Sequence, residues 1–246
     1  MSKPVNYIPA LRFHWLTPLF DPLLKWVMQE ENFKRRPIRQ ANIQRNMQVR
    51  DLGCGTGTLT LMLKSAYPDV KVIGLDADVQ VLDLARAKAG SIEIHWDEGF
   101  AYSLPYPDTY FDKVVTSLVI HHLTRDEKRR TFRVVFRVLK PQGELHLLDF
   151  GTPHSILARL ITSYMRHLEE VADHYDGLIP HFVSEAGFKS ISEEERFLTI
   201  FGPLSLWRAI KGAKHVGTTS LCDSLRNRIG RHDRTDPLDH ADNSCW

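Results

Sequence analysis

The chain has 246 residues, 43% hydrophobic and 25% charged, and its 32 Lys and Arg residues nearly balance 30 Asp and Glu residues. This composition, with only three scattered cysteines, excludes a disordered chain, a collagen-like chain and a disulfide-stabilised scaffold, and predicts a globular core. No apolar stretch approaches the roughly 20 residues of a membrane span, and the first residues lack a secretion signal, so we expect a cytoplasmic protein.

The first segment, residues 1–46, is basic and rich in aromatic residues. Residues 1–50 carry a net charge of +6, whereas residues 51–212 carry −4. We interpret the basic segment as an appendage packed on the core, with peripheral membrane contact as a secondary interpretation and no nucleic-acid partner. If it closes over a site as a lid, then Tyr7, Phe13 and Trp15 are candidates for the substrate pocket.

Residues 47–212 alternate between short apolar strands and amphipathic helices, which predicts an α/β domain with a mainly parallel sheet. The expected strands and helices are, in chain order, strand 47–52, helix 59–66, strand 70–75, a helix between Asp78 and Gly90, strand 92–95, strand 113–118, helix 125–139 and strand 144–149. A turn is expected at 141–143. The basic residues from Lys128 to Arg137 are expected to face solvent.

The pattern changes after Gly151. Helices are expected at 155–166 and 179–186, followed by strands at 188–200 and 204–210 around Gly202-Pro203. These two strands would form a hairpin that adds antiparallel strands to the edge of the sheet. Residues 213–246 lose all periodicity and predict a flexible polar tail. The expected organisation is thus a lid segment (1–46), a catalytic domain (47–212) and a tail (213–246).

A glycine-rich turn follows the first strand. Gly53, Gly55 and Gly57 alternate just before a helix, so a ligand can approach the backbone N–H groups at the helix start. Asp76 closes the second strand, where a carboxylate can accept both hydroxyls of a ribose. The spacing is GxGxG and lacks the third glycine of dinucleotide sites, so the pattern predicts a nucleoside ligand.

Four segments in order, residues 49–60, 74–81, 104–112 and 137–145, resemble class I S-adenosylmethionine-dependent methyltransferases. The resemblance spans roughly residues 45–211 and is greatest to the ubiquinone/menaquinone-biosynthesis branch. It implies a Rossmann-like three-layer αβα fold with a seven-stranded, mainly parallel sheet and an antiparallel terminal hairpin. It also implies S-adenosylmethionine as the cofactor and S-adenosylhomocysteine as the product.

The same resemblance assigns cofactor contacts to the ends of the strands. The glycines of the loop would face the methionine part, Asp51 would hold the loop and the methionine amine, and Asp76 would bind the ribose. Phe100 stands where many relatives have an acidic residue, so the adenine would be bound by backbone groups there. The full expected set is Asp51, Gly53, Cys54, Gly55, Gly57, Asp76, Ala77, Gly99, Phe100, Ala101 and Ser117, with Ser117 beside the transferable methyl group.

His121 and His122 follow the fourth strand, and Asp149 ends the fifth. His122 is the candidate catalytic base, although a histidine there could also simply hold the loop, and a base is needed only if the acceptor arrives protonated. Asp149 either orients the substrate or caps the next segment. Two adjacent histidines without a third ligand at useful spacing predict no metal site.

The expected function is methyl transfer by in-line displacement to a small or lipophilic acceptor. Two other classes stay open from the residues: a non-catalytic module that binds the cofactor and regulates a partner, and an NAD(P)-dependent oxidoreductase on a similar sheet. The GxGxG spacing speaks against the oxidoreductase.

Overall fold

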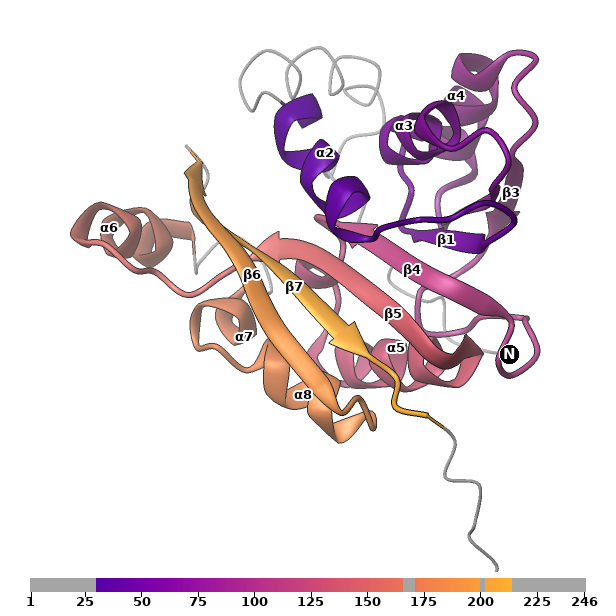
Figure 1. Cartoon of the computed structure of the whole chain (residues 1–246). Helices are drawn as coiled ribbons and strands as arrows, with labels where there is room; N and C mark the ends of the chain where they lie inside the picture. Colours follow the sequence, from indigo (N-terminus) through magenta and orange to yellow (C-terminus); the bar gives the residue numbers. More distant parts are fainter. Residues whose placement is uncertain (1–29, 166–170, 200–201, 214–246) are drawn as a thin grey trace, which may run out of the picture. The chain divides into compact units, whose positions relative to one another are not determined.

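The computed structural model describes residues 30–165, 171–199 and 202–213 (Figure 1). The predicted lid residues Tyr7, Phe13 and Trp15 lie outside these ranges, as does the tail beyond Ala213. The strands are β1 (Gln48–Leu52), β2 (Lys71–Asp76), β3 (His95–Glu98), β4 (Phe111–Ser117), β5 (Leu139–Phe150), β6 (Ser190–Thr199) and β7 (Gly202–Ile210). The helices are α2 (Glu30–Gln40), α3 (Thr58–Ala66), α4 (Val79–Ala89), α5 (Arg125–Val138), α6 (Ile156–Met165), α7 (Ala172–Tyr175), α8 (Ile179–Glu185) and the 3-10 turn η2 (Ile120–His122).

The seven strands form one sheet in the order β3-β2-β1-β4-β5-β7-β6, which confirms the predicted fold class. Strands β1 to β5 are parallel, and β7 runs antiparallel to both β5 and β6. The chain reverses its direction of travel across the sheet between β1 and β4. In sheets of this kind ligands bind beyond the carboxyl ends of the strands at that point.

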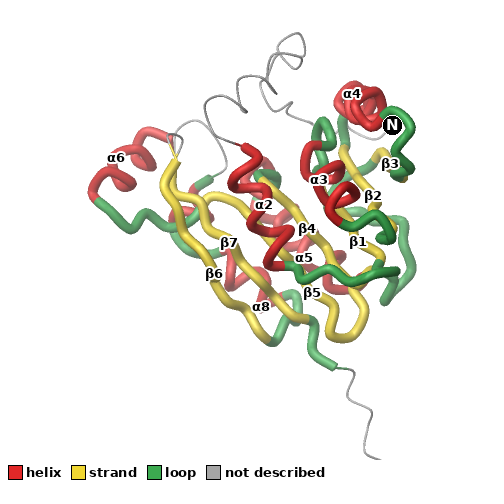
Figure 2. The backbone as a smooth tube through the Cα atoms, turned by 45° about the horizontal axis from the view of Figure 1, so that its top comes forward, coloured by secondary structure: helices red, strands yellow, loops and turns green. Residues whose placement is uncertain are grey.

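Helices cover both faces of the sheet (Figure 2). On one face Phe132 of α5 and Phe182 of α8 pack in a cluster with Leu52 and Phe111 of the sheet. On the other face Leu63 of α3 and Ile38 of α2 belong to a cluster with β1 and β2 residues. Each fully buried side chain of this size contributes about 1.5–3 kcal/mol. The core therefore fixes where the strand ends lie.

Two helix ends were predicted correctly from local signals. The Asp78 carboxylate accepts hydrogen bonds from the backbone N–H groups of Gln80 and Val81, and α4 ends at Gly90. Helix α5 begins with a capping box in which Thr124 and Glu127 satisfy each other's backbone N–H groups. These caps place the start of α4 next to Asp76 and the start of α5 next to the carboxyl end of β4.

Two predicted strand boundaries were wrong. The third strand starts at His95 rather than Ile92, because the Trp96 ring lies over Gly74, where an added Cβ would be 2.7 Å from the ring. This contact sets the pairing of Gly74 with Trp96. The expected turn at 141–143 lies inside β5, which is continuous from Leu139 and bends at Gln142 (φ 64°).

The expected solvent-facing position of Lys128 was also wrong. Its side chain is fully buried, and its ammonium nitrogen lies 3.3 Å from an Asp173 carboxylate oxygen. Asp173 belongs to α7, a one-turn helix that the sequence pattern did not predict. Because α7 covers this part of α5, the predicted basic face is only partly in water.

A partly buried ion pair joins β1 to the edge strand β3. Arg50 of β1 is 0% exposed, and its Nη1 lies 2.6 Å from Asp97 Oδ2 on β3. The guanidinium also lies 4.6 Å from the centre of the Tyr106 ring, whose hydroxyl donates a hydrogen bond to Asp97. Among the described residues, the charge of Arg50 thus has one carboxylate and two aromatic rings, Tyr106 and Phe111 (5.5 Å), as its compensation.

We expect Asp97→Ala to lower the free energy of unfolding by about 3 kcal/mol, because it leaves the buried guanidinium uncompensated. Asp108→Ala is the matched control, since Asp108 pairs with Arg137 at the surface and its loss should cost less than about 1 kcal/mol. Urea unfolding of the two variants makes the comparison. Equal losses would show that the burial of Arg50 does not depend on Asp97.

Candidate active site

The glycine loop between β1 and α3 forms one wall of the site. An added Cβ at Gly53 would lie 2.3 Å from the Val119 side chain, and one at Gly57 would lie 2.7 Å from the Trp96 ring. At Gly55, where φ is +55°, an added Cβ would meet nothing within 4 Å. Gly53 and Gly57 are therefore needed for packing, and Gly55 is the predicted contact that borders open space.

Asp76 connects this loop to β2. One carboxylate oxygen accepts a hydrogen bond from the Gly55 N–H at 2.8 Å, and the other accepts one from the Asp78 N–H at 3.0 Å. Burial raises the pKa of Asp76, partly offset by these backbone donors. An acidic group held in this way, next to the open side of the loop, can accept ribose hydroxyls with its remaining lone pairs.

Asp51 lies below the loop and is 1% exposed. It accepts a hydrogen bond from the Thr60 hydroxyl at 2.6 Å, which ties β1 to α3. Burial raises the pKa of Asp51 to about 6, against the opposing effect of the Thr60 hydrogen bond. Cys54 is also buried, which raises the pKa of its thiol, so the thiol is not a nucleophile at neutral pH.

The segment expected to contact an adenine lies beside Asp76. The Gly99 N–H donates a hydrogen bond to the Asp76 carbonyl oxygen at 2.9 Å, which brings residues 99–101 to the end of β2 next to Ala77. The Phe100 ring stacks on Tyr102, with ring centres 5.2 Å apart and planes 8° apart. The structure thus brings the predicted residues of β1, β2 and the 99–101 segment to one edge of the sheet.

The end of β4 supplies an unsatisfied polar atom. The Ser117 hydroxyl oxygen is buried and has no hydrogen-bond partner among the described residues. The next residue, Leu118, has φ +59°, a conformation that costs a non-glycine residue about 1–3 kcal/mol and is found mostly at functional sites. An orphaned hydroxyl and the open side of Gly55 fit a polar ligand bound along this edge.

Asp149, at the end of β5, holds the loop that follows β4. Its Oδ2 accepts hydrogen bonds from the backbone N–H groups of Val119 (3.2 Å) and Ile120 (2.8 Å). Its Oδ1 lies 2.8 Å from His121 Nδ1 and accepts the N–H of Phe150 at 2.8 Å. Burial alone would raise the pKa of Asp149, but the nearby histidines and these donors hold it well below its usual range. The carboxylate is therefore ionised, and His121 must donate its Nδ1–H to it.

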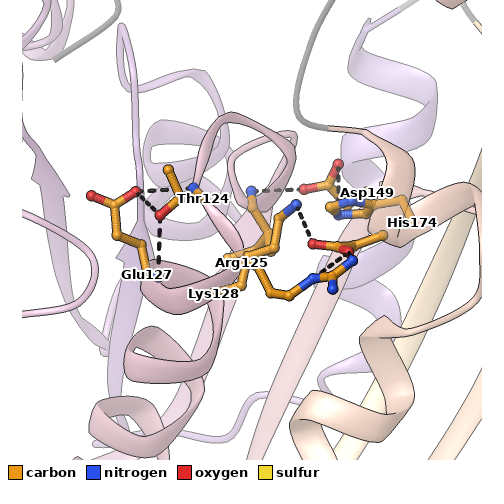
Figure 3. A network of polar contacts seen from close by, with 8 residues as sticks. Thr124, Arg125, Glu127, Lys128, Asp149 and His174 are labelled. Atoms are coloured by element: carbon orange, nitrogen blue, oxygen red, sulfur yellow. Dashed lines mark hydrogen bonds and ion pairs between the residues drawn. The ribbon is translucent and has the colours of Figure 1, made fainter. Parts of the chain in front are cut away.

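Two further histidines surround this pair. His174 of α7 is fully buried, with Nε2 3.7 Å from Asp149 Oδ1, and neither ring nitrogen has a hydrogen-bond partner in the described part of the chain (Figure 3). The His122 ring centre lies 4.0 Å from that of His121. Burial lowers the pKa of both His122 and His174 to about 3, so both rings are neutral at pH 7.

A second acidic group ties α5 to α7 next to this cluster. Asp173 accepts hydrogen bonds from Arg125, at 2.9 and 2.6 Å, and from Lys128, at 3.3 Å. Burial opposes ionisation of Asp173, but the two basic side chains lower its pKa. This ion pair fixes the helix that carries His174.

Sequence reasoning missed three of these residues. Trp96 could have been found from its position opposite Gly74 in the neighbouring strand, had the strand boundary been right. His174 and Asp173 had no local signal, because they lie on a single helical turn far along the chain from Asp149 and Lys128. Within the described residues, no group of three or more His, Cys, Asp and Glu side chains is arranged to hold a metal ion.

Comparisons with known proteins agree with this geometry. Residues 49–143 match a family model described as a methyltransferase domain. The chain is 33% identical over 162 residues to a demethylmenaquinone methyltransferase of Deinococcus radiodurans, covering 63% of this chain and 66% of the relative. It is 31% identical over 171 residues to a demethylmenaquinone methyltransferase of Thermus thermophilus, covering 68% of this chain and 76% of the relative. A ubiquinone/menaquinone biosynthesis C-methyltransferase of Pectobacterium atrosepticum is 34% identical over 137 residues, or 54% of this chain and 53% of that relative.

Solved structures share the fold at lower identity. A SAM-dependent methyltransferase of Methanosarcina mazei superposes with a TM-score of 0.59 at 23% identity, covering 72% of this chain and 98% of the other. A Haemonchus contortus phosphoethanolamine N-methyltransferase, solved with S-adenosylhomocysteine, superposes with a TM-score of 0.60 at 15% identity, covering 74% of this chain and 52% of the other. The glycine loop, Asp76 and β4 thus belong to a fold that is shared with solved methyltransferases.

The raised pKa of Asp51 predicts a stability that rises as the pH falls. A carboxyl whose pKa is higher in the folded state than in the unfolded state binds its proton more tightly when folded. Between pH 7 and pH 5 this group should add about 1 kcal/mol to the free energy of unfolding. Asp51→Asn removes the titration and keeps an acceptor for Thr60. As the pH falls from 7 to 5, the free energy of unfolding of the variant minus that of the wild type, measured in urea, should therefore decrease. A difference that does not change with pH would contradict the raised pKa of Asp51.

Proposed function

The chain belongs to the class I S-adenosylmethionine-dependent methyltransferases of the ubiquinone/menaquinone-biosynthesis branch, and we propose from this that it methylates a ring carbon of a lipophilic quinol-type acceptor. The relatives named for demethylmenaquinone methylation support this acceptor class. The observation that carries the proposal is the His121–Asp149 pair beside the orphaned Ser117 hydroxyl, at the edge where the cofactor loop opens.

The residues of this chain fit the cofactor. When bound, S-adenosylmethionine supplies a methyl group that is already activated by its sulfonium. Gly55 would leave room for the methionine part, Asp76 would accept the ribose hydroxyls, and Asp51 would face the methionine amine. Backbone groups of Phe100 and Ala101 would border the adenine, since the Phe100 ring cannot accept its amino hydrogen. The rate then depends mainly on holding the acceptor in line with the methyl group.

Methylation of a quinol ring carbon releases one proton overall, because the hydroxyl proton leaves to activate the ring and the hydrogen of the methylated carbon then moves to the oxygen as aromaticity is restored. His121 is the group we assign to accept the hydroxyl proton. Because Asp149 takes the Nδ1–H, the lone pair of His121 is on Nε2, and the carboxylate stabilises the ring when it becomes charged. His122, the candidate from sequence, has a pKa lowered to about 3 by burial and is a poor base at neutral pH. We therefore assign His122 to packing against His121.

The organisation into a lid (1–46), a catalytic domain (47–212) and a tail (213–246) is part of this proposal. Helix α2 supports it, because Phe33 packs against Phe150 and Leu204 at the carboxyl end of β5. A segment that enters the fold next to this edge can bring Tyr7, Phe13 and Trp15 over the acceptor. Within the described residues, none of the helices has the length and hydropathy of a membrane span.

We expect Asp76→Asn to weaken the binding of S-adenosylhomocysteine roughly 10- to 100-fold, because it replaces a charged acceptor with a neutral amide in a buried position. Asp69→Asn, at an exposed position distant from the loop, should leave the affinity unchanged. Isothermal titration calorimetry measures both. Equal affinity of the Asp76→Asn variant and the wild type would refute the cofactor assignment.

His121→Ala should lower the rate of methyl transfer by about 10²- to 10⁴-fold while the affinity for S-adenosylhomocysteine stays within threefold. His122→Ala is the matched control and should keep at least a third of the rate. Asp149→Asn should shift the rate in the same direction as His121→Ala, because the neutral amide no longer stabilises a charged ring.

The assay follows S-adenosylhomocysteine release with a short-chain quinol acceptor. If His121→Ala kept the wild-type rate while His122→Ala lost it, the base assignment would be wrong. Cofactor binding without turnover across several quinols would instead favour the non-catalytic regulatory module.

A further inference from the structure

Helix α6 exposes large apolar side chains to solvent. Ala158 is fully buried and Thr162 is 3% exposed, so these two residues lie on the face that packs on the protein. The outward face carries large apolar residues: Ile156 is 80% exposed, Leu160 is 66% exposed and Leu157 is 57% exposed. A surface helix of a globular domain normally turns its large apolar side chains toward the core.

These three are the most exposed large apolar side chains among the described residues. The others in this class, Val79, Leu84, Ile92 and Leu198, are between 37% and 43% exposed and do not gather on one helix face. The outward face of α6 is thus a contiguous apolar patch, which we call the α6 patch (Ile156, Leu157 and Leu160). Such patches mark contact sites for other molecules.

Helix α6 carries one charge. Residues 151–165 contain one arginine, Arg159, and no Asp or Glu, whereas the domain as a whole is mildly acidic. Arg159 lies on α6, is exposed, and has no ion pair in the described part of the chain. An apolar face with a basic residue beside it is complementary to a surface that is apolar inside and anionic outside, which is the character of a phospholipid bilayer.

The position of α6 connects the patch to the active site. The helix starts six residues after Phe150, the end of the strand that carries Asp149, and packs against β7 beside that strand (Figure 1). Ten residues of helix are about 15 Å long, half the hydrocarbon thickness of a bilayer. The helix is therefore too short to span a membrane but long enough to lie in its surface.

We propose that the α6 patch docks on the surface of an anionic phospholipid bilayer and presents the active-site edge of the sheet to an acceptor held in that bilayer. The second part rests on the proposed function, because a lipophilic quinol partitions into lipid. The docking itself does not rest on that function, because the exposure of the three apolar side chains, the charge of Arg159 and the length of α6 support it separately.

Vesicle co-sedimentation of the full chain tests the docking. The probes are vesicles of phosphatidylcholine alone and of phosphatidylcholine with phosphatidylglycerol. We expect the triple variant I156S/L157S/L160S to lose at least tenfold in partition to the mixed vesicles. The control variant V79S/L84S/I92S removes three apolar side chains of similar size near the opposite edge of the sheet and should bind like the wild type. Arg159→Gln should weaken binding to the mixed vesicles more than to the neutral ones.

Equal partition of the two triple variants would overturn the proposal. So would a wild-type dimer in sedimentation velocity that becomes a monomer in I156S/L157S/L160S and does not bind vesicles, because the patch would then be covered by a second copy. Turnover of a water-soluble quinol without vesicles is measured in parallel. If it is absent in all proteins while vesicle binding behaves as expected, the proposed function fails and the docking stands.

Discussion

The buried carboxylate of Asp149 is the interaction on which the site depends. It receives backbone N–H groups from Val119 and Ile120 and a ring N–H from His121, so it fixes the loop after β4 in a conformation that is costly at Leu118. A strained residue persists only where its surroundings determine it this strongly. The cost is offset by placing Val119 against Gly53 of the cofactor loop and the His121 ring over the end of β5.

Two acidic groups at the same edge have opposite environments, and this separates their roles. Asp51 is buried and accepts a hydrogen bond from the Thr60 hydroxyl, and burial raises its pKa to about 6. Asp149 is equally buried, but the donors around it keep it ionised, and its hydrogen bonds hold the loop that follows β4. Burial is common to both residues, so the histidines and the hydrogen-bond donors around Asp149 account for the difference in pKa between the two carboxylates.

The sequence predicted much of the fold because the signals are local. Strand and helix periodicity, the Asp78 cap and the Gly90 end are properties of neighbouring residues, and the seven-stranded, mainly parallel sheet with its antiparallel hairpin followed from the resemblance to a known family. The errors arose where a distant contact overrode the local pattern. The packing of Trp96 on Gly74 sets the start of β3 at His95 rather than at the predicted Ile92. Helix α7 buries Lys128, although the helical spacing of α5 predicts that Lys128 faces solvent. Neither contact can be inferred from spacing along the chain.

The sequence by itself determined the class of ligand, since the glycine loop and Asp76 lie within one βαβ unit whose geometry is nearly fixed. Only the tertiary structure decided which of the two histidines pairs with a buried carboxylate. His121 and His122 are adjacent and chemically identical, and they differ because β5 places the Asp149 carboxylate against the His121 ring. That difference arises from the pairing of β4 with β5 and from the position of α7, which are set by the packing of the whole domain.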